Sequence, residues 1–293
     1  MGVSVIIPTL NAGAALDRLL AALENQTIAP DEIIVVDSQS EDDTVRIAKG
    51  YDRVRVIEIA RGEFDHGGTR DMALRQTKGE FVLFLTQDAL PADERAIERL
   101  LKPFEDPRVA AAGGRQIAWP NARPAEKLMR AHSYPEKSRV WQAEDIKRLG
   151  LRAFLISDVF AAYRKEAYLA AGGFDHPLLT DEDVLMAQRL LRTGYKLAYS
   201  GEAAVFHSHD FTFAQQFRRN LLIGRVLRRY EERLEGAREM GEGVRLARAI
   251  VAQLVREGHF IECARFSLDC AARLLGNRMG RWIEGRSARG DGV

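Results

Sequence analysis

The sequence predicts an α/β protein with a mostly parallel, open sheet flanked by helices, followed by a helical C-terminal extension. Short apolar runs rich in β-branched residues recur through the first two hundred residues and alternate with stretches of helical periodicity. Strand, helix, strand is the repeating unit of a parallel sheet. Beyond residue 211 the apolar residues recur every three or four positions, as on one face of a helix. We therefore expect a sheet domain over residues 1–210 and an arginine-rich helical extension over 211–293.

The composition indicates a globular protein of a reducing compartment. The 293 residues are 46% hydrophobic, enough for a sizeable core, and carry a formal net charge of +1. This small charge hides an asymmetry, because residues 211–293 hold 16 arginines against 10 acidic residues. We expect the two cysteines, Cys263 and Cys270, to be buried and unreactive. No apolar run approaches the ~20 residues of a membrane-spanning helix and the first strand begins at once, so we expect a cytoplasmic protein.

The first three elements predict a parallel strand pair. Residues 3–9 form an apolar, β-branched run, and the turn at residues 11–13 releases an amphipathic helix over about 14–24. Residues 32–36 form the second strand.

A polar run at residues 37–44 follows this second strand. It is too rich in carboxylates to cradle phosphates, which need glycines and backbone N–H groups. We expect it to contact a ribose or a pyrimidine ring instead, through Asp37 above all. Asp42 or Asp43 is explained equally well as the cap of a helix that runs to Ala48.

The third predicted strand covers residues 53–59, and a glycine-rich loop at 62–70 leads from it to a helix over 71–76. In this loop glycines bracket His66 and precede Arg70. Glycines let the backbone approach a ligand closely, and a guanidinium suits the diphosphate of a nucleotide. The alternative for Arg70 is a solvated helix residue.

The fourth predicted strand, residues 81–85, delivers Asp88 to its carboxyl end. In open α/β sheets ligands bind in the crevice beyond these ends, so Asp88 is a candidate site residue. The alternative is that Asp88 caps a helix over about 92–97.

The second half adds strands over residues 109–117 and 157–163 and then an acidic run of Asp181, Glu182 and Asp183 that opens a helix to Thr193. Three neighbouring carboxylates cannot all be comfortably ionised in one cleft, so at least one pKa should rise. The alternative is an acidic first helical turn favoured by the helix dipole. Short strands over 196–198 and 203–206 then lead to the histidines at 207 and 209.

Two absences narrow the class of enzyme. No Gly-x-Gly-x-x-Gly follows a strand, which disfavours a dinucleotide oxidoreductase, and no Gly-x-x-x-x-Gly-Lys occurs, which disfavours a P-loop NTPase. A nucleotidyltransferase would need a basic, glycine-rich loop after the first strand, and residues 11–13 do not form one.

Several segments resemble one family. Four features together resemble the donor half of the family 2 glycosyltransferases, which have the GT-A fold with a Rossmann-like nucleotide-binding half. They are residues 5–9, residues 35–38 followed by Ser40, Arg70 opening a helix, and residues 84–88. The run at 64–70 and Thr86-Gln87-Asp88 are similar to the rhamnosyltransferase-like branch, and residues 170–175 are similar to the family's Gly-Gly-Phe-Asp segment.

The resemblance implies a division of the sheet domain into a donor half, residues 1–90, and an acceptor half, residues 91–210. It implies that Asp183 is the general base, with Asp181 and Glu182 orienting the acceptor. The residues it implies for the nucleotide-sugar donor are Pro8, Thr9, Asn11, Asp37, Ser38, His66, Gly67, Arg70, Gln87 and Asp88.

The resemblance further implies a divalent cation, Mn²⁺ or Mg²⁺. Asp88 is the expected ligand, and in related enzymes a histidine placed like His207 completes the coordination, with His209 a weaker candidate. The sequence departs from the commoner family pattern, because Thr86 stands where an aspartate is usual. An imidazole ligand favours Mn²⁺.

The activity implied is an inverting, metal-dependent transfer of a sugar, with L-rhamnose from dTDP-L-rhamnose as the first expectation, to a hydroxyl of a glycan or lipid-linked acceptor in cell-surface polysaccharide synthesis. The missing aspartate at position 86 keeps open a non-catalytic module that binds nucleotide sugars or acts as a scaffold. No nucleic-acid-binding motif is recognisable, so nucleic acid is not an expected partner.

Two regions leave alternatives open. In the family the acceptor binds over residues 119–155, where Trp119 and Trp141 either stack on sugar rings or belong to the core. The arginine-rich helices after Thr212 either lie on anionic lipid at the inner membrane face, pair with another subunit, or pack on the sheet.

Overall fold

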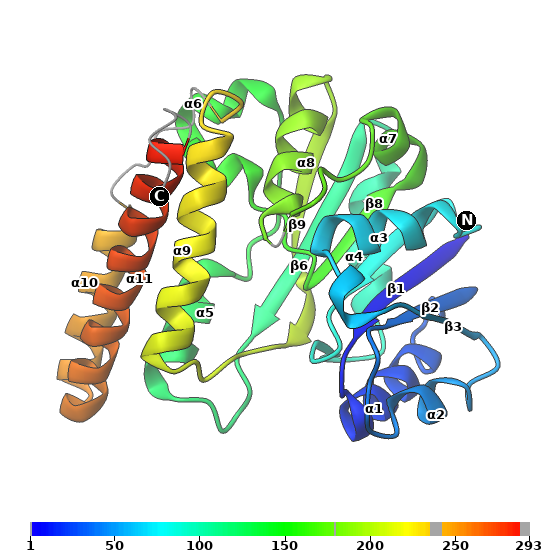
Figure 1. Ribbon diagram of the computed structural model, residues 1–293, viewed down its shortest axis with the longest axis horizontal. Helices are drawn as coiled ribbons and strands as arrows, with labels where there is room; N and C mark the ends of the chain where they lie inside the picture. The colour runs from blue at the N-terminus through cyan, green and yellow to red at the C-terminus, as the bar shows by residue number, and fades with distance from the viewer. Residues whose placement is uncertain (1, 179, 235–241, 288–293) are drawn as a thin grey trace. The chain divides into compact units, whose positions relative to one another are not determined.

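The computed structural model describes residues 2–178, 180–234 and 242–287 (Figure 1). The chain forms two compact units. The first, here called the sheet unit, comprises residues 1–117, 134–145 and 153–207, and the second, the helical unit, comprises 118–133, 146–152 and 208–293. The sheet unit ends near the predicted boundary at residue 210, but the segments 118–133 and 146–152 group with the C-terminal helices.

The sheet has the strand order β3-β2-β1-β4-β8-β6-β9-β5, and β7 pairs with β9 outside this path. The strands are β1 (Val3–Thr9), β2 (Glu32–Asp37), β3 (Val54–Glu58), β4 (Phe81–Leu85), β5 (Leu90–Pro91), β6 (Val109–Ile117), β7 (Arg139–Trp141), β8 (Phe160–Arg164) and β9 (Lys196–Phe206). The first four are parallel, as predicted, whereas β8 runs antiparallel to both β4 and β6. The sheet is therefore parallel in its first half and mixed in its second.

Helices cover the sheet because its strands are apolar on both faces. In β1, Val5 and Ile7 join a core cluster that includes Leu16 and Leu20 of α1 (Gly13–Glu24). All five residues of β4 are buried, as expected of a strand covered on both faces. The other helices of the sheet unit are α2 (Thr44–Ala48), α3 (His66–Arg75), α4 (Ala96–Leu101), α7 (Lys165–Ala170) and α8 (Glu182–Arg192), with short 3₁₀ turns at η1 (Arg61–Glu63), η2 (Lys102–Glu105) and η3 (Ala143–Asp145).

Helix α3 begins five residues earlier than predicted, so His66 to Arg70 are helical and do not form a loop. The cause is an N-cap: the Asp65 carboxylate accepts a hydrogen bond from the Gly68 N–H at 2.5 Å. Arg70 therefore lies in the second turn of a helix and does not open it.

Helix α4 begins later than predicted, at Ala96, and residues 90–91 form the short strand β5. The residue before the helix is Arg95. The alternative in which Asp88 caps a helix is therefore wrong.

The two short strands predicted over 196–198 and 203–206 are one strand, β9. Its pairing with β6 shifts register between Ser200 and Ala204, which marks a bulge. The predicted break is this bulge.

The strand directions bring several chain segments to one edge of the sheet. Strands β1, β2 and β4 are parallel, and β6 and β9 run the same way because β8 is antiparallel to both β4 and β6. Their carboxyl ends, together with the start of β8, therefore lie at the same edge. Strand order reverses at β1, which has β2 on one side and β4 on the other, and such a reversal is where open α/β sheets bind ligands.

The helical unit contains α5 (Pro124–Ser133), α6 (Ile146–Leu149), α9 (Phe213–Arg229), α10 (Glu242–Arg256) and α11 (Phe260–Ser287), with the 3₁₀ turn η4 (Gly150–Phe154) at its border. Thr212 caps α9 through a capping box with Gln215. Helices α9 and α11 pack along each other, and a methyl group on Gly276 or Gly280 would overlap a backbone carbonyl of α9. Glycines thus allow the two backbones to touch.

The structure tests two expectations about this unit. Cys263 and Cys270 are free thiols and both are half-buried, so the prediction that they are buried was wrong. Both lie on α11 at the margin of a small core cluster that includes Ile250, Leu254 and Phe266, so each is covered on one side. Among the described residues no helix combines the length and the apolar character that a bilayer span requires.

Candidate active site

The carboxyl edge of the sheet collects most of the predicted site residues. Thr9 ends β1, Asp37 ends β2, Asp88 follows β4, and His207 follows β9. Each side chain is placed there by an apolar strand whose two buried faces fix its register. Residues far apart in the sequence thus share one edge.

Asp37 is a buried carboxylate held by hydroxyl groups. Its oxygens accept hydrogen bonds from the Thr9 hydroxyl at 3.1 Å, the Ser40 hydroxyl at 2.5 Å and the Ser40 N–H at 2.8 Å. The hydroxyl of the neighbouring Ser38 is buried with no hydrogen-bond partner among the described residues. A buried hydroxyl without a partner is ready to bind a ligand.

The loops after β1 and β4 are joined by Gln87. Its side-chain oxygen accepts from the Leu10 N–H at 2.8 Å, and its amide nitrogen donates to the Leu10 carbonyl at 3.2 Å. Asn11, at a positive φ of 51°, accepts from the Glu41 N–H at 2.8 Å. Pro8 is half-buried beside them in β1. The predicted donor-binding loops are therefore cross-linked into one structure.

The glycines of the run at 64–70 pack against protein. A methyl group on Gly67 would overlap the Asp175 carbonyl oxygen, so the close approach at this position is to residues of the same chain. His66 is half-buried, and its Nδ1 lies 3.1 Å from a guanidinium nitrogen of Arg70. A donor contact by His66 or Gly67 stays a prediction.

Arg70 is buried between two carboxylates. Only 3% of it is exposed, and one guanidinium nitrogen donates to Glu182 at 3.2 Å. Its Nε lies 4.0 Å from an oxygen of Asp158, which is 4% exposed. The pairing explains how Glu182 and Asp158 can be buried, because a buried charge needs a partner. The predicted contact of Arg70 with a diphosphate remains a prediction.

Asp158 was not a predicted site residue. It lies just before β8, and its other oxygen accepts from the Tyr163 hydroxyl at 2.9 Å. Burial raises the pKa of Asp158 to about 7, and repulsion from Glu182 adds to the rise, while Arg70 and the hydrogen bond from Tyr163 lower it. A single acid in the apolar stretch at residues 156–160 was the available signal.

Asp183 is the acid most crowded by other acids. Its carboxylate accepts from the Asp158 N–H at 3.3 Å and from the Val184 N–H at 2.8 Å. Burial first, and then repulsion from Asp158, Glu182 and Asp181, holds the pKa of Asp183 well above its usual range. The raised pKa of Asp183 agrees with the prediction that at least one pKa in the acidic run rises.

The acidic run and the loop of Asp88 are connected through the two residues that precede β8. Val159 accepts a hydrogen bond from the Thr86 N–H at 3.3 Å, and the adjacent Asp158 donates to Asp183. The Thr86 hydroxyl is buried with no hydrogen-bond partner in the described part of the chain.

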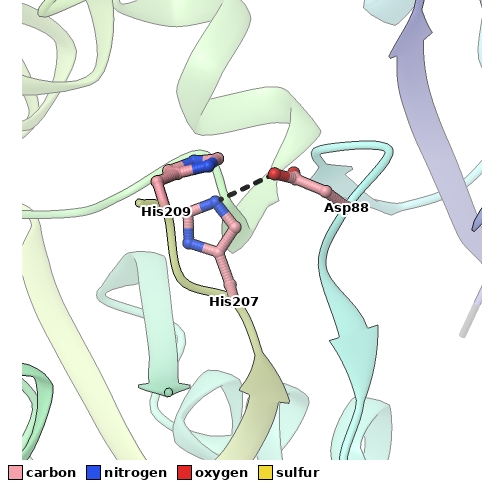
Figure 2. Close-up of side chains that lie close together, drawn as sticks. All are labelled: Asp88, His207 and His209. Atoms are coloured by element: carbon pink, nitrogen blue, oxygen red, sulfur yellow. Dashed lines mark ion pairs between the residues drawn. The ribbon is translucent and has the colours of Figure 1, made fainter. Parts of the chain in front are cut away.

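Figure 2 shows three side chains of metal-binding type, Asp88, His207 and His209. Within the sheet unit the carboxylate of Asp88 lies 3.5 Å from Nε2 of His207, and the carboxylate side chain is 40% exposed while the imidazole is 5% exposed. His209 lies two residues further along the chain, in the helical unit, and its role as a ligand stays a prediction.

Gln116 fixes which ring nitrogen of His207 faces Asp88. The amide nitrogen of Gln116 donates to Tyr134 at 2.9 Å and to Ser157 at 3.0 Å, which turns its oxygen toward Nδ1 of His207, also at 2.9 Å. Nδ1 therefore carries a proton, and in the neutral ring Nε2 presents a lone pair.

A lone pair and a carboxylate oxygen 3.5 Å apart repel each other unless a proton or a cation lies between them. An oriented imidazole, a half-exposed carboxylate and a supporting amide are a donor set that fits a divalent cation.

The two candidate acceptor tryptophans differ in burial. Trp141 is 2% exposed and donates from its indole nitrogen to the Ala153 carbonyl at 2.7 Å, so it is a core residue, as the alternative reading held. Trp119 is half-buried, and its N–H donates to the Ser208 hydroxyl at 3.2 Å.

Comparisons with known proteins bear on the family and the fold of the chain. The family model for glycosyl transferase family 2 matches residues 4–170. The chain is 37% identical to the O-antigen chain rhamnosyltransferase RfbN of Salmonella typhimurium, over 96% of this chain and 90% of the relative. It is also 37% identical to the O-antigen chain rhamnosyltransferase WbaN of Salmonella anatum, over 95% of this chain and 89% of the relative.

Solved structures support the fold. The mannosyltransferase PcManGT from Pyrobaculum calidifontis, in complex with GDP-Man and Mn²⁺, aligns with a TM-score of 0.61 at 18% identity, covering 98% of this chain and 86% of that one. TarS residues 1–349 of S. aureus, in complex with UDP-GlcNAc, aligns with a TM-score of 0.56 at 16% identity, covering 99% and 92%. These likenesses confirm the predicted GT-A fold.

Proposed function

This chain belongs to glycosyl transferase family 2, and on that premise we propose that it transfers L-rhamnose from dTDP-L-rhamnose to a hydroxyl of a glycan or lipid-linked glycan, in the synthesis of a cell-surface polysaccharide. Glycosyltransferase activity follows from the family and from relatives that match nearly the whole chain. The sugar and its acceptor are proposed because both of these relatives carry the name O-antigen chain rhamnosyltransferase. We place the reaction in the cytoplasm.

The observation that carries the catalytic proposal is the environment of Asp183. A carboxylate whose pKa lies well above the usual range of an aspartate is matched to the removal of a hydroxyl proton near neutral pH. Burial and neighbouring acids produce this rise, and Arg70 keeps two of those acids, Glu182 and Asp158, paired. We assign Asp183 as the general base and Glu182 and Asp181 as neighbours that orient the acceptor.

The bond changes in this proposal are a single displacement. The acceptor oxygen attacks the anomeric carbon of the sugar as its proton passes to the Asp183 carboxylate. The bond from the anomeric carbon to the diphosphate oxygen breaks, and the nucleoside diphosphate leaves with both electrons of that bond. Attack opposite the leaving group inverts the anomeric centre.

The donor is assigned to the edge between β1, β2 and β4. Asp37, with its fixed hydroxyl partners, suits the hydroxyls of a ribose or the N–H of a pyrimidine ring. The buried hydroxyls of Ser38 and Thr86, which lack partners among the described residues, are available to the same ligand. Asp88 and His207 are the residues that would hold a divalent cation, Mn²⁺ or Mg²⁺. Such a cation would supply positive charge beside the leaving diphosphate.

A panel of nucleotide sugars tests the donor. The full-length enzyme is incubated with dTDP-rhamnose, UDP-glucose, UDP-N-acetylglucosamine or GDP-mannose, a bacterial lipid extract as the source of acceptor, and Mn²⁺, and nucleotide release is measured. We expect release from dTDP-rhamnose by the parent enzyme, and release at least about 10²-fold slower by the Asp183→Asn variant. Turnover of a UDP- or GDP-sugar without turnover of dTDP-rhamnose would remove the rhamnose proposal and leave the glycosyltransferase in place.

The rival reading is a module that binds nucleotide sugars without turnover. Thr86, in place of an aspartate, is the feature that favours it. In that case the protein would bind the nucleotide, and no nucleotide sugar in the panel would release its nucleotide with any acceptor.

A further inference from the structure

One exposed face of α11 is apolar along most of the helix. Its residues share a spacing of three, four or seven, which places them within one narrow stripe, and each is between 46% and 88% exposed. We call them the outer face: Ile261, Leu268, Leu275, Met279 and Trp282. The stripe runs for about 32 Å at the rise of an α-helix. Large apolar residues scattered singly need no explanation, but a continuous row of them does.

The acids of α11 point away from the outer face. Glu262 pairs with Arg123 at 2.9 Å and Asp269 pairs with Arg273 at 2.9 Å. Glu284 is buried between Arg225 and Arg229, at 2.9 Å and 2.7 Å. None of the described residues of α11 is therefore an exposed acid, and every acid on it already has a cation beside it.

The exposed charges of α11 are arginines. Arg265 and Arg278 are exposed on the two sides of the outer face, and Arg265 shares an exposed ion pair with Asp210 at 3.3 Å. Arg286 lies one turn beyond Trp282, its guanidinium 5.1 Å from the centre of the indole ring. An apolar stripe with an indole and flanking arginines has the pattern of a helix that lies in the interface of an anionic bilayer.

The same arginines argue against a second copy of the chain as the partner of the outer face. A second copy placed on the outer face would bring the arginines of both copies together, where like charges repel. Spanning the bilayer is also disfavoured, because no described helix is long and apolar enough.

We propose that the outer face of α11 is a membrane-docking surface that lies flat on an anionic lipid bilayer, with Leu268, Leu275 and Trp282 in the acyl boundary and the arginines at the phosphates. Binding of this kind adds apolar burial to attraction by anionic headgroups, so it needs both. The proposal does not depend on the donor or on the transfer reaction.

Vesicle flotation of the full-length protein tests this surface. Vesicles of equal parts phosphatidylcholine and phosphatidylglycerol are compared with vesicles of phosphatidylcholine alone, at low and at high salt. We expect the protein to float with the anionic vesicles only and to be released by salt. We expect Leu275→Glu to weaken this binding by about tenfold or more, because it puts a charge in the middle of the stripe.

Leu274→Glu is the matched control. Leu274 is 52% exposed and Leu275 is 59% exposed, and the two are adjacent on α11, yet they face directions about 100° apart. We expect Leu274→Glu to leave flotation unchanged and both variants to melt like the parent protein.

Three results would overturn the proposal. One is the absence of flotation with anionic vesicles. Another is an equal loss in Leu274→Glu and Leu275→Glu, which would mean that the outer face has no special part. The third is a dimer in light scattering that Leu275→Glu converts to monomer while vesicle binding is unchanged, which would assign the face to a second copy.

Discussion

Arg70 illustrates how one residue can have a meaning that its local sequence does not carry. It is helical and nearly fully buried, and its partner Glu182 lies 112 positions away. A guanidinium between two carboxylates lowers the cost of burying all three groups. Burial and the neighbouring carboxylates hold the pKa of Asp183 above its usual range. The arrangement concentrates the unfavourable charge on the residue proposed as the base.

The first prediction concerns Asp183 itself. Asp183→Asn keeps the size of the side chain and removes its ability to accept a proton, so we expect kcat to fall by about 10²–10⁴ with a KM for the donor that changes little. Steady-state rates with a saturating acceptor extract measure both constants. A kcat within a few-fold of the parent value would show that another group takes the proton.

The second prediction concerns the pH dependence. The base works as the carboxylate, so the raised pKa of Asp183 should place the acid limb of the kcat/KM profile above the usual range of an aspartate. Asp158→Asn removes a neighbouring negative charge that raises this pKa, and the limb should therefore move to lower pH. Rates measured across the pH range for both proteins check the sign.

The asparagine can still accept a hydrogen bond from Tyr163, so a loss of packing does not explain a shifted limb. A folded Asp158→Asn enzyme whose limb stays in place would contradict the proposed coupling.

Among single residues, the sequence predicted the candidate site residues that end or follow an apolar strand. Asp37 and Asp88 both do so, and the structure places them at the carboxyl edge of the sheet. It did not predict Asp158, because a single acid near the start of the strand predicted over 157–163 is expected to face solvent, and only the folded structure shows that it is buried.

At the scale of elements, the differences from prediction come from side chains that override local propensity. The two glycines at 67 and 68 are poor helix formers, so they predicted a loop. The structure instead has a helix, because Asp65 caps it and because Gly67 must sit against Asp175. The cap is a local signal that the two glycines outweighed, whereas the contact of Gly67 with Asp175 is not visible in the local pattern.

The third prediction concerns the packing of α9 on α11. A methyl group on Gly280 would overlap the Leu221 carbonyl, so Gly280→Ala should force the helices apart and destabilise the helical unit by about 1–3 kcal/mol. Gly243→Ala is the control, since nothing lies within 4 Å of its added methyl group and alanine is the better helix former.

Thermal melting followed by circular dichroism compares the two variants. We expect a lower Tm for Gly280→Ala and an unchanged or higher Tm for Gly243→Ala. Equal melting of Gly280→Ala and the parent would mean that the backbones of α9 and α11 do not need this contact.

At the scale of the whole molecule, the parallel half of the sheet was predictable because its strands and helices alternate in the sequence. The second half was less so. Its strands pair with partners distant in sequence, such as β9 with β5, β6 and β7, and their order depends on long-range pairing that local patterns do not encode. The same limit explains why segments 118–133 and 146–152 were assigned to the sheet domain.

The central claim is that the carboxyl edge of the sheet binds a nucleotide sugar with the help of a cation held by Asp88 and His207. Isothermal titration with dTDP and with UDP, each with and without Mn²⁺, tests it on the parent protein and on Asp88→Ala. We predict that dTDP binds, that binding requires Mn²⁺, and that Asp88→Ala abolishes it. The absence of binding by either nucleotide with and without metal, in a protein that is folded by circular dichroism, would contradict the account.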